Sequence, residues 1–177
     1  MRNTAFLALG VALLILQANL HRLVSLVSIP GATPSLVLPV VLFMGVNEYS
    51  LARGAALAFL LGYLLDLFAG APGGVFTFIT VASFVVSRLA GVRLSAQSVF
   101  SQMSLALVFA LVEGVLVVVF TALFGLDVAR PRALARLILP HAISTALFAP
   151  IVFRAAAKVH QATLAVVGAG SGEGPGA

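Results

Sequence analysis

The chain has 177 residues, of which 62% are hydrophobic and only 8% are charged, and its mean hydropathy is +1.18. A typical soluble domain is about 45–50% apolar and about 25% charged. A small water-soluble fold leaves much of its surface exposed, so it could not hide this much apolar surface. The composition therefore excludes an ordinary soluble domain. It predicts an integral membrane protein, an all-α bundle of about six transmembrane segments.

The formal net charge of +5 arises from ten basic and five acidic residues, and the basic ones are scattered between apolar runs. This spacing is typical of contacts with lipid head groups and of topology signals, and it does not indicate a nucleic-acid surface. The sequence has no cysteine, which excludes disulfide and thiolate chemistry.

The first two apolar segments are separated by a proline-containing break. Residues 4–20 follow a short basic start and are not followed by a convincing small-residue cleavage site, so we expect a retained anchor. The stretch PGATP at 30–34 interrupts the chain, because proline restricts its own backbone and that of the preceding residue. The next segment, 35–46, would span only about 18 Å as a helix, against a hydrocarbon core of about 30 Å. It also contains Pro39, so we expect a kinked, tilted or half-crossing helix within the bundle.

Four more apolar segments follow, at about 51–68, 75–89, 103–124 and 134–153. We expect residues 1–160 to form one transmembrane domain and the Gly-rich residues 161–177 to form a disordered cytoplasmic tail. Six crossings place both termini on one side of the membrane. The positive-inside rule favours a cytoplasmic N-terminus, because six basic residues then lie at inner ends and four at outer ends. The inner six are Arg2, Arg53, Arg88, Arg93, Arg154 and Lys158, and the outer four are Arg22, Arg130, Arg132 and Arg136.

The third segment carries a stripe of small residues with an aspartate in it. The stripe consists of Gly54, Ala58, Gly62, Asp66 and Gly70, which recur every four residues. This spacing places them along one face of a helix, and small residues at that spacing let two membrane helices approach closely. We therefore expect this face to be buried against another helix, with the Asp66 carboxylate directed into the protein.

Asp66 lies near the end of its segment, where a negative charge is at the unfavourable end of the helix dipole. Compensation is available from the backbone N–H groups of Gly73 and Gly74, which open the fourth segment, or from an arginine at an outer end (Arg22, or Arg130 to Arg136). We predict that Asp66 is buried within hydrogen-bond reach of such donors. Two interpretations remain open: an interfacial residue that caps a turn, or a residue that binds a partner or ligand.

Glu113 lies near the middle of the fifth segment, where an ionised carboxylate is costly. We expect it to face the interior of the bundle, beside Gly114, which would allow a close helix neighbour. His141 in the sixth segment reaches a comparable depth if the two helices are antiparallel. A Glu113–His141 pair would serve either as a proton relay or as a static hydrogen bond that fixes the packing.

Three features carry a family resemblance: a Pro-Ser pair before the short second segment, a Gly-x-x-x-Asp-Leu-x-x-Gly-x-x-x-Gly motif at the end of the third, and a proline followed by basic residues in the last. The residues are Pro34, Ser35, Gly62, Asp66, Leu67, Gly70, Gly74, Pro150, Arg154 and Lys158. Together with the length and the number of segments, this pattern over residues 1–160 resembles MreD, the bacterial rod shape-determining membrane protein family.

The resemblance implies a non-enzymatic scaffold of the cell-elongation machinery in the bacterial inner membrane. The expected partners are MreC most directly, then the actin-like MreB filament and the peptidoglycan polymerase with its penicillin-binding protein. The family often has a larger apolar residue where this chain has Gly73, which predicts a looser turn here.

A second hypothesis is the substrate-binding membrane subunit of a small-molecule importer of the vitamin type, which has a similar size and a six-span layout. Such subunits gather polar and aromatic residues around one ligand, whereas this chain has no Trp and two Tyr, which favours the scaffold. The sequence contains no nucleophile elbow, P-loop or metal-ligand spacing. We therefore expect neither enzymatic chemistry nor a cofactor.

Overall fold

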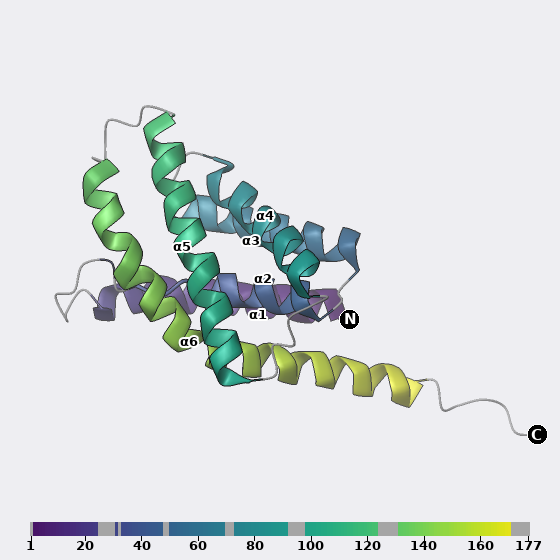
Figure 1. Cartoon of the computed structure of the whole chain (residues 1–177). Coiled ribbons are helices and arrows are strands. Elements are labelled where there is room, and N and C mark those ends of the chain that lie inside the picture. Colours follow the sequence, from purple (N-terminus) through teal and green to yellow (C-terminus); the bar gives the residue numbers. More distant parts are fainter. Residues whose placement is uncertain are drawn as a thin grey trace, which may run out of the picture.

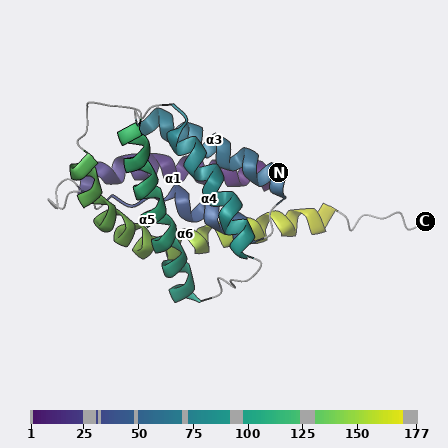
Figure 2. The ribbon, with the colours of Figure 1, turned by 45° about the horizontal axis from the view of Figure 1, so that its top comes forward.

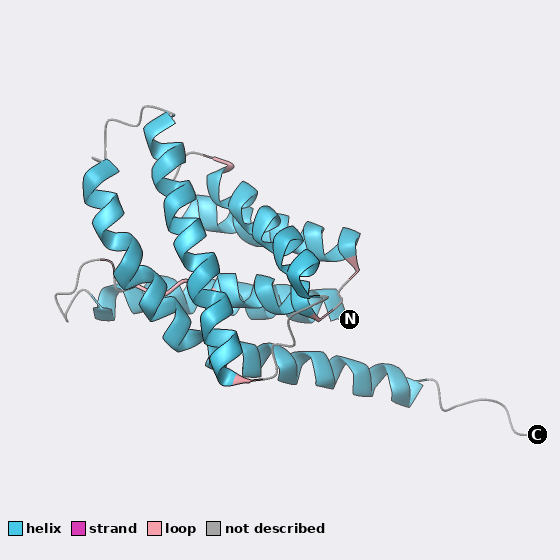
Figure 3. Cartoon of the chain, viewed as in Figure 1, coloured by secondary structure: helices cyan, strands magenta, loops and turns pink. Residues whose placement is uncertain are grey.

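The computed structural model describes residues 2–24, 31, 33–47, 50–69, 73–91, 98–123 and 131–170. These residues form six α-helices and no strand (Figure 3), which confirms the predicted all-α class. The helices are α1 (Arg2–Val24), α2 (Val37–Val46), α3 (Leu51–Ala69), α4 (Val75–Gly91), α5 (Val99–Leu123) and α6 (Pro131–Gly170).

Two helix pairs, a short central helix and α1 make up the bundle. Helices α3 and α4 form an antiparallel hairpin, and α5 packs along the first part of α6 (Figure 1). Helix α2 contacts every other helix, so it occupies the centre. The start of α1 and the end of α6 lie toward the same side of the molecule in both views (Figures 1 and 2).

Helix α2 is short, apolar on every side and enclosed by its neighbours. All of its residues from Val37 to Gly45 are buried, as expected for a helix that is hydrophobic all round. Pro39 is the third residue of the helix, where its missing N–H has no intrahelical partner to lose. The predicted short helix inside the bundle is therefore confirmed, and Pro39 fits it without breaking a helical hydrogen bond.

Three helical stretches are long and apolar enough to cross a membrane: Leu51–Ala69, Val99–Leu123 and Ala133–Thr163. Three shorter apolar stretches accompany them: Thr4–Leu20, Val37–Val46 and Val75–Leu89. The outer surface is apolar as well, with exposed fractions of 81% for Phe100 and 73% for both Leu89 and Leu123. An apolar exterior of this kind is suited to lipid and not to water.

Helix α6 is longer than the sequence pattern predicted, since it has 40 residues where we expected a span of 134–153. It bends in the part that contains Pro140 and Pro150 (Figure 1), because each proline removes one helical hydrogen bond and crowds the preceding turn. The predicted tail at 161–177 is wrong for residues 161–170, which continue the helix. Residues 161–167 contain no proline, glycine or charge, so each added residue gains a helical hydrogen bond. Residues 171–177 lie outside the described part of the chain.

Candidate functional site

The small-residue stripe of α3 is the face that packs against α4. Gly54, Ala58, Gly62 and Asp66 are all buried. A β-carbon built on Gly62 would lie 2.6 Å from the Cα atom of Thr77, so the two backbones approach too closely there for any larger residue. The Thr80 hydroxyl donates a 3.0 Å hydrogen bond to the Ala58 carbonyl across the same contact. The predicted packing face is thus confirmed, except for Gly70, which lies outside the described residues.

Asp66 caps the first turn of α4 from the neighbouring helix. Its Oδ2 accepts hydrogen bonds from the N–H of Gly74 at 2.9 Å, the N–H of Thr77 at 3.1 Å and the Thr77 hydroxyl at 2.6 Å. Its Oδ1 accepts the N–H of Phe76 at 2.8 Å. Gly74 occupies the N-cap position, where Ser, Thr, Asp or Asn usually supplies the capping oxygen, and Asp66 replaces that missing side chain. The carboxylate also lies at the positive end of the α4 dipole.

These contacts decide between the donors predicted for Asp66. The backbone N–H groups at the start of α4 bind it, as expected, although they belong to Gly74, Phe76 and Thr77 and not to Gly73. No ion pair to Asp66 occurs within the described residues, and Arg136 is exposed. The side chains of Arg22 and Arg132, and all of Arg130, lie outside the description. Because both oxygens are already occupied and the side chain is only 4% exposed, the geometry favours the turn-capping interpretation over ligand binding.

The turn before α4 offers a matched test of this cap. Gly74 has φ = +101°, a conformation that costs an L-residue about 1–2 kcal/mol, whereas a β-carbon on Gly73 would meet no atom within 4 Å. We expect Gly74→Ala to lower the free energy of unfolding by about that amount and Gly73→Ala to leave it nearly unchanged. Thermal unfolding in detergent micelles, followed by far-UV circular dichroism, measures both. Equal effects of the two substitutions would contradict this account of the turn.

Polar side chains from α1 and α6 hold the segment before α2 in a similar way. The Gln17 Oε1 accepts the N–H of Leu36 at 2.8 Å, and the Thr145 hydroxyl accepts the N–H of Ser35 at 2.9 Å. His141 Nδ1 donates to the Thr33 carbonyl at 2.6 Å, since a carbonyl oxygen can only accept. No local pattern predicts these contacts, because the partners are separated by up to 110 residues.

Glu113 faces the interior, as predicted, but it does not pair with His141. The glutamate is 5% exposed, and its Oε2 is buried without a hydrogen-bond partner. A β-carbon on Gly114 would lie 2.8 Å from the Cγ2 atom of Ile138, so Gly114 does allow the close approach of α6. The Glu113–His141 hydrogen bond considered from the sequence does not form: Glu113 Oε2 has no partner, and His141 Nδ1 instead bonds the Thr33 carbonyl, which the non-helical segment before α2 leaves free.

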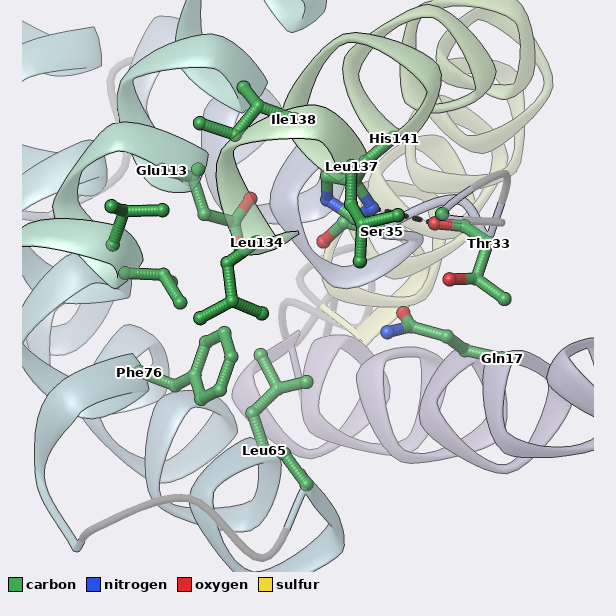
Figure 4. Close-up of a pocket in the computed structure, with 15 residues that line it drawn as sticks. Gln17, Thr33, Ser35, Leu65, Phe76, Glu113, Leu134, Leu137, Ile138 and His141 are labelled. Carbon is green, nitrogen blue, oxygen red and sulfur yellow. Dashed lines mark hydrogen bonds between the residues drawn. The ribbon is translucent and has the colours of Figure 1, made fainter. Parts of the chain in front are cut away.

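A cavity of about 270 Å³ lies between these polar groups. Its wall is formed by α1, the segment before α2, the connected end of the α3–α4 hairpin, and the facing parts of α5 and α6 (Figure 4). Gln17, Thr33, Ser35, Glu113 and His141 contribute the polar part of this wall. The rest is apolar, and the carboxyl group of Glu113 points into the cavity (Figure 4).

Comparisons of this chain with known protein families, with curated proteins and with solved structures find no match.

Proposed function

We propose that the chain is a non-enzymatic, multi-pass scaffold of the bacterial inner membrane, of the MreD kind, with both termini in the cytoplasm. In this role it supports cell elongation and rod shape by linking MreC and MreB to peptidoglycan synthesis. MreC is the most direct partner, and the peptidoglycan polymerase and its penicillin-binding protein belong to the same assembly.

The observation that carries the proposal is the use of the motif residues in the α3–α4 hairpin. Gly62 gives α4 its close approach, and Asp66 caps the helix that Gly74 opens. Three of the residues on which the MreD resemblance rests, Gly62, Asp66 and Gly74, thus build the α3–α4 hairpin, which supports a structural role. A rigid bundle with an apolar exterior is suited to holding partner helices in a membrane.

In vivo crosslinking followed by purification from membranes tests this proposal. We expect a periplasm-facing coiled-coil protein of the MreC type to copurify with the full chain. A Gly62→Leu variant, whose hairpin is overpacked, should recover much less of it, whereas Ala56→Leu on the exposed side of α3 should recover as much as the wild type. Recovery of no such protein from crosslinked membranes would contradict the scaffold role.

One observation favours the importer subunit as a second candidate. The cavity beside the short α2 has both polar and apolar walls, as a buried site for a small ligand requires. A growth assay under depletion of individual vitamins separates the two candidates. If purified protein binds a vitamin at submicromolar affinity, the importer function replaces the scaffold.

A further inference from the structure

Among the described residues, one buried side-chain polar atom has no hydrogen-bond partner. This atom is Oε2 of the Glu113 carboxyl group. Leaving such a group unpaired costs free energy, more for a charged group than for a neutral one. Asp66, by contrast, has a donor for each oxygen, although it is buried to a similar degree. The capping carboxylate of Asp66 therefore has hydrogen-bond donors for both oxygens, whereas the carboxyl group of Glu113, which points into a cavity, does not.

The charges around the cavity define what can pair with Glu113. No lysine or arginine is among the described residues that line it. Among the described lining residues, the one other titratable group is the His141 ring, whose Nδ1 already donates to the Thr33 carbonyl. In the neutral ring the remaining nitrogen, Nε2, is an acceptor. The hydroxyls of Thr33 and Ser35 and the amide of Gln17 add uncharged polar groups to the wall. Among the described residues, the wall thus carries one acid and no permanent cation.

The rest of the cavity wall is apolar. Leu65 and Phe76 close it on the side of the α3–α4 hairpin, and Leu134 and Leu137 close it on the side of α6 (Figure 4). Val117 of α5 also lines it. The volume of about 270 Å³ is near the lower end of the range for small-molecule sites, about 300–1,000 Å³. A fitting ligand is therefore small and mostly apolar, with a single polar end.

We infer that this cavity binds a small amphiphile whose protonated amine pairs with the Glu113 carboxylate and whose hydrocarbon body lies against Leu65, Phe76 and Val117. An ammonium group supplies a positive charge, which the described part of the wall lacks, and N–H donors that the Glu113 carboxylate can accept. An anionic ligand of the same shape would meet Glu113 without a compensating cation. The inference depends on the cavity and on Glu113 alone, so it holds or fails independently of the scaffold role.

Titration of the purified full chain in detergent micelles tests the inference with n-hexylammonium chloride as the probe. Isothermal titration calorimetry should show saturable one-to-one binding of hexylammonium, with weaker binding of 1-hexanol and none of hexanoate. Bound hexylammonium should also raise the midpoint of thermal unfolding, because a ligand that binds the folded state stabilises it by mass action. Equal heats and equal shifts for all three compounds would overturn the inference, since they would indicate partition into the micelle.

Two variants distinguish the contribution of the Glu113 carboxylate to binding from that of the cavity's shape. Glu113→Gln keeps the shape and should weaken hexylammonium binding by about tenfold or more, since hydrogen bonds to charged groups are the strong ones. Its affinity for 1-hexanol should not change. Val117→Phe keeps the carboxylate, fills the cavity and should abolish binding of both compounds. Unchanged hexylammonium affinity in Glu113→Gln, with a native helical spectrum, would refute the site.

Discussion

Asp66→Ala is expected to lower the free energy of unfolding by on the order of 3–5 kcal/mol. The substitution removes the acceptor of four hydrogen bonds at once, three from backbone N–H groups and one from the Thr77 hydroxyl. The first turn of α4 then has no cap, because Gly74 has no side chain to supply one. Thermal and denaturant unfolding in detergent micelles should both report the loss.

A graded series of substitutions checks that loss of the helix cap causes the loss of stability. Asp66→Asn keeps one acceptor oxygen but sets an amide N–H₂ against the remaining donors, so its effect should be intermediate. Thr77→Val removes the hydroxyl donor alone and should cost about 1 kcal/mol. Thr121→Val is the matched control, since the Thr121 hydroxyl bonds only the carbonyl of Val117 in its own helix. If Asp66→Ala unfolds like the wild type, Asp66 does not cap the hairpin.

Gly62→Leu is expected to have the second-largest effect. A branched side chain at this position meets the backbone of α4, where a β-carbon alone would already lie 2.6 Å from the Cα atom of Thr77. Backbone cannot move aside as a side chain can, so overpacking should cost about 1–3 kcal/mol or more. In cells the variant should behave like a deletion and yield rounded cells with little copurified MreC.

Ala56→Leu is the control, because it introduces the same leucine side chain in the same helix. Ala56 is on the same helix but exposed, so its leucine faces outward and should be tolerated. Unfolding midpoints and cell aspect ratios should therefore match those of the wild type. If Gly62→Leu is harmless while Ala56→Leu rounds the cells, the stripe is not the packing face.

The features that could be predicted from the sequence are those with a local period or a local break. The four-residue spacing of Gly54, Ala58 and Gly62 identified the face of α3 that packs on α4, because helical periodicity fixes which residues share a face. The proline-containing break at 30–34 and the length of the next apolar run predicted the short α2. The position of Asp66 near the end of its segment, before Gly73 and Gly74, predicted that donors at the start of the next helix would bind it, although turn capping and ligand binding both stayed open.

The features that could not be predicted depend on groups far apart in the chain. His141 bonds a carbonyl 108 residues away, and no local pattern indicates that Thr33 would compete with Glu113 for its ring. The length of α6 was underestimated because Arg154, Lys158 and His160 interrupt the apolar run, whereas the helix continues to Gly170. Hydropathy marks the apolar span, and it does not distinguish a helix that ends at a polar stretch from one that continues past it.

Depletion of the protein from rod-shaped cells that carry it, with the cell aspect ratio measured by microscopy, tests the central claim most directly. The scaffold role predicts that cells become round as the protein is lost, that wild-type protein and Ala56→Leu restore the rods, and that Gly62→Leu does not. Depleted cells that keep their aspect ratio through several divisions would contradict the scaffold role.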